Sequence, residues 1–503
     1  MKKIYLLVTV CLIQQIYSQN AGTLDTTFGF NGISKLCGDT TYVPLSLELQ
    51  SDNKIIFNNY FNTYRYNSNG TVDATYGQVG VLNWSNLMFL GVYPNSEIQQ
   101  DDKLILYYRK ITNTANSAII ARFTVNGQLD TTFNGIGYLN LPNLTQFSFG
   151  NKVKIQSDGK IVVVGYSGPS LEFFTVVRVN SNGTLDTTFG INGIAKTLFN
   201  AGLEAEATCV NIQQDGKIIV AGKFYNFDYG YDLGVLRFTS SGILDTTFGD
   251  NGKVITRYNS YNVDDLPNNI LINSDGTIIV SGYLDTGAIS RPLFVKYLSN
   301  GTLDSTFGTN GIMALGSVNC GSGTPALQID GKIIVPLVGY YINGEEFKVC
   351  RLNVNGSIDT TFGSNGYYTQ NFSENQKTST CILIQPNNKI LVGGVCSNDN
   401  NSALCNVIIS LNPGVILNTT TFNENEITLY PNPSKGIINI KTTNNSEELF
   451  TITVYNVLGQ TVYLENQTLI NDKTINVSNL VAGVYYVTFS NELGVVKKTL
   501  LIE

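Results

Sequence analysis

A ten-residue motif recurs seven times along the chain, and this repetition constrains the fold more than any other feature. Its clearest copy, LDTTFGINGI, combines an aspartate, an aromatic residue and an Asn-Gly pair. The copies start 48 to 59 residues apart, at Leu24, Val72, Leu129, Leu185, Leu244, Leu303 and Ile358. Units of this length that hold several short strands are typical of β-propellers, whereas solenoid coils are usually shorter.

Each unit is expected to fold as four antiparallel strands. In the fourth unit the pattern predicts strands at 207–213, 217–224, 233–239 and 253–257, joined by turns at Asp-Gly and Ser-Gly pairs. The second of these strands holds an apolar run, 218–221, without alternation. Such a run indicates a strand that neighbouring sheets cover on both faces.

The two ends of the repeat array complement each other. A motif copy at Leu24 has no unit before it, and the last unit stops near Gly414 with no motif after it. A ring in which an N-terminal strand completes the last unit explains both ends and removes exposed sheet edges. The sequence therefore predicts an all-β protein with a seven-bladed β-propeller over 19–414, the alternative being an open array.

The motif itself is interpreted as structural. The Asp186 carboxylate can accept a hydrogen bond from the backbone two residues further along the chain. Gly190, Asn192 and Gly193 can adopt positive φ angles. The ring of Phe189 can serve as an aromatic anchor between neighbouring sheets. The alternative is a calcium site in the turn, although no run has EF-hand spacing.

The N-terminus predicts export. Two lysines precede a short apolar run, so residues 1–18 are interpreted as a secretory signal peptide. No later run is long enough for a membrane-spanning helix. The net charge of −7 and the pI of about 4.9 provide no basic surface for nucleic acid.

Histidine is absent, which excludes a Ser-His-Asp triad, a Cys-His dyad and any His-ligated metal. No metal or cofactor is expected. Seven cysteines remain after the signal peptide. Cys396 and Cys405 flank one polar loop and suit a disulfide across a hairpin, whereas Cys209 and Cys381 share a repeat position and are expected as buried thiols.

A ligand is expected on the face of the ring where the connections between strands vary. The turns inside each hairpin are short and uniform, whereas the connections at the opposite ends of the strands differ among the copies. Exposed aromatic rings beside amides and carboxylates suit sugars. Tyr60, Phe61 and Tyr64 lie in one such connection, and the candidate ligand-binding residues are Tyr225, Phe227, Asp228, Tyr229, Tyr231, Asp232, Trp84, Tyr107, Tyr108, Tyr340 and Tyr341. The alternative is that most of these rings pack at sheet edges.

A different β pattern follows a polar linker at 415–426. Short alternating strands are expected at 436–441, 450–455, 461–464, 474–477, 484–489 and 495–502, which suggests an immunoglobulin-like sandwich over 427–503.

Two resemblances extend these expectations. The motif LDTTFGxNG resembles the delta-60 β-propeller repeats of bacterial surface proteins, over 24–414, and implies a fold without assigned catalytic residues. The segments LYPNPSKGIINI, VYNVLGQTVY, NLVAGVYYVTF and KKTLLIE resemble the type A sorting domain of type IX secretion. This second resemblance implies the type IX machinery as a partner and a secreted or cell-surface location in a Gram-negative bacterium.

The sequence thus predicts a non-catalytic extracellular protein that binds a polysaccharide or a surface protein. A glycan-cleaving enzyme is a second hypothesis, because carboxylate pairs lie in loops of the variable face: Glu204 with Glu206, Asp264 with Asp265, and Glu345 with Glu346. A structural spacer is the third.

Overall fold

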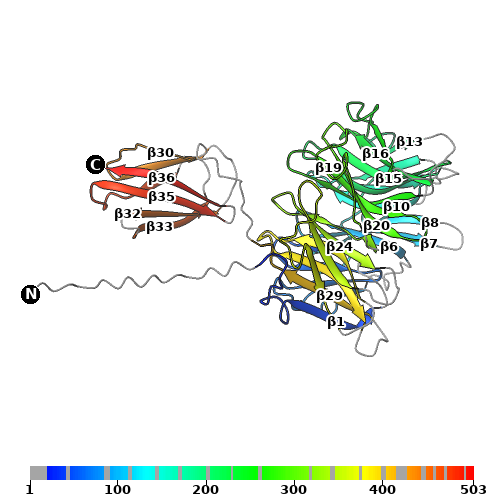
Figure 1. Cartoon of the computed structure of the whole chain (residues 1–503), viewed down its shortest axis with the longest axis horizontal. Helices are drawn as coiled ribbons and strands as arrows, with labels where there is room; N and C mark the ends of the chain where they lie inside the picture. The colour runs from blue at the N-terminus through cyan, green and yellow to red at the C-terminus, as the bar shows by residue number, and fades with distance from the viewer. Residues whose placement is uncertain are drawn as a thin grey trace, which may run out of the picture. The chain divides into compact units, whose positions relative to one another are not determined.

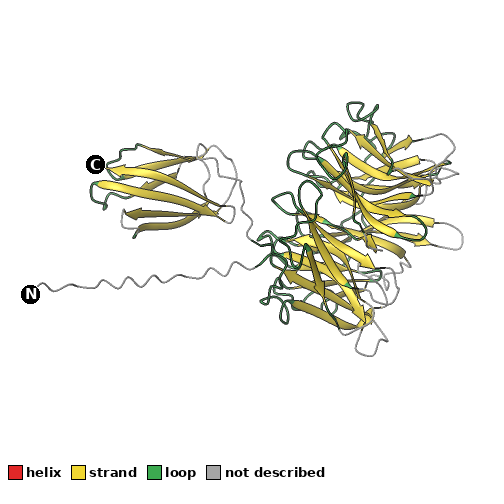
Figure 2. Cartoon of the chain, viewed as in Figure 1, coloured by secondary structure: helices red, strands yellow, loops and turns green. Residues whose placement is uncertain are grey.

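The computed structural model divides the chain into two compact units, Met1–Val415 and Ile416–Glu503. The structure describes residues 20–40, 46–83, 91–111, 116–141, 147–167, 173–199, 204–227, 230–258, 263–316, 320–339, 346–372, 377–397, 404–414, 427–442, 449–456, 460–468, 473–491 and 494–503. All regular structure in these residues is β-strand (Figure 2). The expected signal peptide and linker lie outside them.

The fourth repeat shows how one unit is built. Strands β14 (Ala205–Ile212), β15 (Ile218–Asn226), β16 (Gly230–Phe238) and β17 (Lys253–Thr256) form an antiparallel sheet in chain order. All four strands lie where the sequence predicts them. The first five residues of β15 are buried, as expected for a strand covered on both faces.

Six further sheets in the described residues repeat this arrangement, which confirms the all-β fold of four-stranded antiparallel repeats. The first sheet holds β2 (Ser46–Leu49), β3 (Ile55–Asn58), β4 (Asn62–Tyr66) and β5 (Val81–Asn83). The second holds β6 (Gly91–Ile98), β7 (Leu104–Ile111), β8 (Asn116–Phe123) and β9 (Tyr138–Leu141). The third holds β10 (Phe147–Ile155), β11 (Ile161–Ser167), β12 (Phe173–Val179) and β13 (Ile194–Leu198).

The remaining repeats follow the same order. The fifth sheet holds β18 (Asp264–Ile272), β19 (Ile278–Asp285), β20 (Ser290–Tyr297) and β21 (Ile312–Ala314). The sixth holds β22 (Cys320–Ser322), β24 (Ile333–Gly339), β25 (Phe347–Leu352) and β26 (Tyr367–Gln370), with the two-residue β23 (Ala326–Leu327) paired to β24. In this sheet the first strand is split in two.

The seventh sheet joins the two ends of the repeat array. Strand β1 (Ile33–Thr40) pairs with β29 (Leu404–Leu411), which continues to β28 (Ile390–Ser397) and β27 (Lys377–Ile384). In Figure 1 the blue β1 lies beside the yellow β29. Strand β2 in turn contacts β27, and each later sheet contacts the one before it. The ring therefore closes, with the N-terminal strand as its last member.

A disulfide links the strands at this closure. Cys37 on β1 lies opposite Cys405 on β29, and their Cα atoms are 4.1 Å apart. The predicted pairing of Cys396 with Cys405 is wrong. Cys396 lies opposite Cys405 on the other side of β29, and Cys37 occupies the matching place on the N-terminal strand. Cys209 and Cys381 are buried free thiols, as expected, and burial raises the pKa of each to about 12.

The ten-residue motif is a structural turn, as interpreted. The Asp186 carboxylate accepts hydrogen bonds from the backbone N–H and the hydroxyl of Thr188, at 3.1 and 2.6 Å. Gly190, Asn192 and Gly193 have φ angles of 53°, 51° and 91°. The ring of Phe189 is fully buried in the core shared by the third and fourth sheets.

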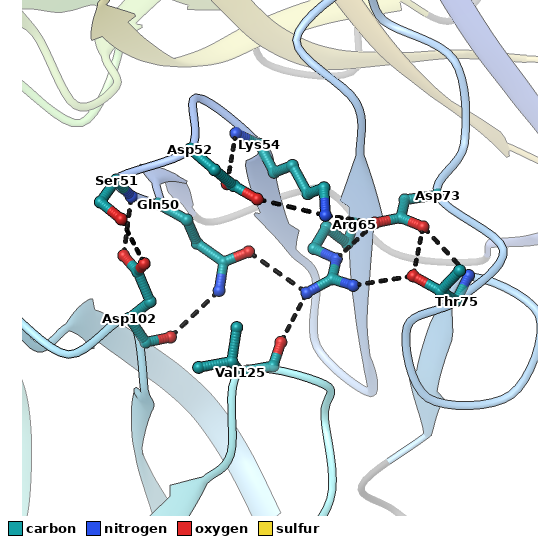
Figure 3. Close-up of polar contacts among 9 residues, drawn as sticks. All are labelled: Gln50, Ser51, Asp52, Lys54, Arg65, Asp73, Thr75, Asp102 and Val125. Atoms are coloured by element: carbon teal, nitrogen blue, oxygen red, sulfur yellow. Dashed lines mark hydrogen bonds and ion pairs between the residues drawn. The ribbon is translucent and has the colours of Figure 1, made fainter.

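In six of the seven repeats, a cation from the third strand forms an ion pair with the aspartate of this turn. In the seventh, Ser410 stands at that position and Lys389 pairs with Asp25. Arg65 donates to the Asp73 carboxylate at 2.8 Å and to the Thr75 hydroxyl at 3.1 Å, and it reaches the carbonyl of Val125 in the next sheet (Figure 3). Equivalent ion pairs join Arg122 to Asp130, Arg178 to Asp186, Arg237 to Asp245, Lys296 to Asp304 and Arg351 to Asp359. We call this cluster the Arg–Asp clip. It fixes the turn within a sheet and ties neighbouring sheets together.

The C-terminal unit consists of two sheets that share one core. One sheet holds β30 (Ile427–Tyr430), β31 (Ile437–Thr442) and β34 (Lys473–Asn476). The other holds β33 (Thr461–Thr468), β32 (Leu449–Asn456), β35 (Gly483–Asn491) and β36 (Gly494–Ile502). Residues of both sheets, such as Ile438 and Val487, form the common core. The six predicted strands are present, and β30 was not predicted.

Candidate ligand-binding site

Three aromatic side chains gather at the tip of the β15–β16 hairpin, on the variable face. Tyr225 and Tyr231 lie opposite each other in the hairpin, with ring centroids 5.4 Å apart. Phe227 packs edge-on against Tyr225 with a centroid distance of 5.7 Å, yet 78% of its surface stays exposed. The hairpin thus holds these rings in a fixed arrangement and presents one of them to solvent. We call these three residues the aromatic cluster.

Polar groups from two neighbouring sheets hold the cluster in position. The Tyr231 hydroxyl donates to Glu204 at 2.8 Å, and burial together with this bond raises the pKa of the phenol. The Lys223 ammonium lies 4.5 Å from the centre of the Tyr231 ring and 3.4 Å from Glu206. The backbone N–H of Tyr231 donates to Asp264 of the fifth sheet at 2.9 Å. An apolar surface is therefore rimmed by carboxylates and an ammonium group.

The sequence predicts that Asp232 contacts a ligand, but in the structure its side chain has a structural role. Its side chain is 1% exposed, and both of its oxygens accept from the Arg257 guanidinium, at 2.8 and 2.6 Å. Asn226 also donates to it, at 3.0 Å. Removing one partner of a buried pair like this is strongly destabilising, so Asp232 holds the end of the hairpin next to the aromatic cluster.

The prediction that Tyr107 and Tyr108 bind ligand is wrong. Both rings are fully buried, because β7 extends past them and neighbouring sheets cover both of its faces. Tyr107 belongs to the core with the third sheet and Tyr108 to the core with the first. Tyr64 is buried too, whereas Tyr60 and Phe61 are half-buried. The candidates Trp84, Asp228, Tyr229, Tyr340 and Tyr341 lie outside the described residues.

The two carboxylates beside the aromatic cluster, Asp264 and Asp265, lie in different environments. Asp264 accepts the hydrogen bond from Tyr231, whereas Asp265 is 2% exposed. One Asp265 oxygen accepts from the backbone N–H of Tyr258 at 3.1 Å, and the other has no hydrogen-bond partner among the described residues. Burial, which outweighs that hydrogen bond, raises the pKa of Asp265 to about 7, and the nearby Asp232 charge adds to the effect.

Replacing Asp265 with asparagine is expected to raise the free energy of unfolding by more at about pH 8 than at about pH 5. An unfolded aspartate loses its proton near pH 4, whereas native Asp265 keeps it until about pH 7. The native state therefore binds more protons across this interval, and stability falls as pH rises. Urea unfolding at both pH values measures the effect, with Asp264→Asn as the control. An equal pH dependence in Asp265→Asn and the natural chain would contradict the assignment.

Neither a metal site nor a spanning helix is found in the described part of the chain. No group of three or more Asp, Glu or Cys side chains there is arranged to hold a metal ion. No helix there is long and apolar enough to cross a membrane.

Comparison with known families defines the class of protein that this fold represents. Five stretches of the ring match a β-propeller domain of unknown function, DUF5122, at 99–133, 156–189, 213–248, 273–307 and 328–362. Residues 428–503 match the C-terminal sorting domain of a secretion system. The chain is a β-propeller repeat protein with a type IX secretion sorting domain. That domain indicates export to the cell surface or the extracellular space.

Three solved structures that match the chain are distantly similar to it. A streptogramin B lyase is 11% identical, with a TM-score of 0.45, over 76% of this chain and 97% of that one. A protein of unknown function from Dyadobacter fermentans is 10% identical, with a TM-score of 0.38, over 76% and 100%. An ulvan lyase is 10% identical, with a TM-score of 0.44, over 75% and 94%. No curated protein matches the chain. These similarities assign no activity.

Proposed function

We propose that this protein binds an extracellular polysaccharide through the aromatic cluster, without cleaving it. The observation that carries the proposal is the exposed Phe227 ring, held edge-on against Tyr225 beside the Tyr231–Glu204 hydrogen bond. Sugar rings present apolar C–H faces bordered by hydroxyls. An aromatic surface with a polar rim complements both parts of a sugar.

The charges around the cluster favour a neutral glycan. Glu204, Glu206 and Asp264 surround it, and Lys223 is already paired with Glu206. A ligand with several negative charges would meet repulsion from these carboxylates, whereas hydroxyl groups can donate hydrogen bonds to them. Export by the sorting domain brings this surface into contact with extracellular polymers.

The glycan-cleaving alternative has one supporting observation, which is the raised pKa of Asp265. A general acid must reach the glycosidic oxygen. Asp265 is 2% exposed and accepts a hydrogen bond from the backbone N–H of Tyr258, so a glycan on the aromatic cluster does not reach it. Binding without cleavage therefore fits the geometry better.

Truncating the aromatic cluster is expected to weaken glycan binding. The chain without residues 1–18 is run through gels cast with a panel of neutral polysaccharides, and retardation identifies the one it binds. Phe227→Ala is expected to reduce affinity about tenfold, and the triple variant with Tyr225→Ala and Tyr231→Ala about a hundredfold, because stacked rings contribute roughly 1 kcal/mol or more each.

The matched control is Phe30→Ala, since Phe30 is 83% exposed in a motif turn away from the cluster. The control should migrate like the natural chain. Equal retardation of the triple variant and the natural chain would contradict binding at this cluster, and release of oligosaccharides from the polymer would show that the protein is an enzyme.

A further inference from the structure

Three cysteines lie side by side on neighbouring strands of the seventh sheet. Cys405, on the middle strand β29, lies opposite Cys37 on β1 and opposite Cys396 on β28. Residues that lie opposite each other in an antiparallel sheet point to the same face, and their Cα atoms are about 4.5 to 5.5 Å apart. A disulfide spans Cα distances of roughly 4.4 to 6.8 Å, so Cys396 is placed where it can bond to Cys405.

The disulfide of the structure uses one of these two neighbours. It joins Cys405 to Cys37, and Cys396 keeps its thiol. Because β29 lies between the other two strands, Cys396 and Cys37 flank Cys405 from opposite sides. Thiol–disulfide exchange needs this arrangement, since a thiolate attacks one sulfur of the bond while the other sulfur leaves on the far side.

The three cysteines differ in their access to solvent. Cys37 is exposed, whereas Cys396 and Cys405 are fully buried in the core that the sixth and seventh sheets share. The regular pairing of β1 with β29 is also interrupted directly after Cys37. A Cys37 thiol that is released from the disulfide therefore meets a reagent in solution, while the other two sulfurs stay protected.

We propose that Cys37 is a site of thiol modification that Cys396 opens by thiol–disulfide exchange. The Cys396 thiol loses its proton to solvent, and the thiolate attacks the sulfur of Cys405. The Cys396–Cys405 bond forms, the Cys37–Cys405 bond breaks, and Cys37 leaves as a thiolate. One thiol and one disulfide are present before and after the step, so it needs no oxidant or reductant. The exposed thiolate then reacts with an electrophile.

Alkylation of Cys37 makes the exchange irreversible. The two possible disulfides exclude each other because they share the sulfur of Cys405, and an alkylated Cys37 cannot return to it. Strand β1 then keeps its backbone pairing with β29 but loses its covalent bond to that strand. The inference concerns the closure of the ring and goes beyond the glycan binding proposed above, on which it does not depend.

Labelling with iodoacetamide at about pH 8.5, where more of a thiol is ionised, tests the exchange. The chain without residues 1–18 is labelled in its folded state without reductant, unfolded in excess N-ethylmaleimide and digested without reduction. In the natural chain, Cys37 is expected to carry the iodoacetamide label, and the disulfide is expected to join Cys396 to Cys405. Cys396→Ala removes the attacking thiol and is expected to slow labelling of Cys37 at least tenfold.

The matched control is Cys381→Ala, because Cys381 is a buried thiol of the same sheet that lies opposite Gly393 and not opposite a sulfur. This variant should label at Cys37 as fast as the natural chain. The proposal is overturned if Cys37 of the natural chain stays unlabelled, or if the label appears on Cys396 or Cys405. It is also overturned if Cys396→Ala labels at Cys37 as fast as the natural chain.

A second variant tests the alternative bond by itself. In Cys37→Ser, Cys396 is the cysteine that remains opposite Cys405, so oxidised glutathione is expected to join the two in a disulfide that mass spectrometry detects as a linked peptide. If both cysteines remain thiols in a folded Cys37→Ser chain, Cys396 is not an alternative partner and the proposal is wrong. Retardation in the polysaccharide gels reports on the aromatic cluster and is independent of either result.

Discussion

Replacing Cys37 and Cys405 with serine is expected to lower the free energy of unfolding of the ring by about 3 to 5 kcal/mol. The disulfide joins residues that are 368 positions apart, so it closes almost the whole repeat array into one covalent loop. Without it, the unfolded chain gains the freedom that the loop removes. Pairing with β29 and the other non-covalent contacts of the N-terminal segment then hold β1 in the ring.

Thermal unfolding with and without a reductant measures this effect. Reductant should lower the melting temperature of the natural chain and leave the double serine variant unchanged. Cys396→Ala is the control, because it changes a cysteine of the same sheet and keeps the disulfide. If the double serine variant and the natural chain have the same melting temperature, the disulfide does not stabilise the closed ring.

The second large effect is expected from Arg65→Met, which should cost about 3 to 5 kcal/mol because it removes the buried cation of Asp73 and leaves that carboxylate only the partly exposed Lys54, at 3.4 Å. Arg65 is 1% exposed. Burial alone would raise the pKa of Asp73, but hydrogen bonds from Thr75 and the charge of Arg65 hold it at about 2. Removing the guanidinium also leaves the carbonyl of Val125 without its donor.

Urea unfolding of three variants separates these contributions. Arg65→Met with Asp73→Asn should recover part of the loss, because no buried charge remains. Arg65→Lys should be milder than Arg65→Met, since the fifth repeat uses Lys296 beside Asp304 at 3.1 Å. If Arg65→Met costs less than about 1 kcal/mol, the Arg–Asp clip is a minor surface contact and the interpretation is wrong.

The repeat pattern was enough to predict most of the ring. The strands of the fourth unit and the pairing of the N-terminal strand with the last unit both follow from the spacing of the motif and from its unmatched copy at Leu24. These features depend on local turn residues and on closure of a β-sheet, which recur in every unit. The same regularity predicted the buried Phe189.

Features that depend on contacts between distant segments were harder to predict. Tyr107 and Tyr108 resemble exposed loop tyrosines in sequence, but neighbouring sheets cover both faces of β7 and bury the two rings. The partner of Cys405 lies on the strand from the other end of the array, so proximity in sequence pointed to the wrong cysteine.

The hydrogen bonds at the junctions between sheets lay beyond any sequence pattern. Gln50, Gln99, Gln156 and Gln213 occupy the same repeat position and are the same residue type. The amides of Gln50 and Gln156 donate to the turn of the next sheet, whereas the buried Oε1 atoms of Gln99 and Gln213 have no hydrogen-bond partner in the described residues.

The shared seventh sheet makes closure of the ring depend on both ends of the repeat array. Strand β1 precedes its partner β29 by more than 350 residues. A chain that lacks β29 leaves β1 without its partner strand, and an unpaired strand edge can pair with another chain. Oxidising conditions favour the Cys37–Cys405 bond once the two strands meet. Closure of the ring is therefore a step that only the finished chain can complete.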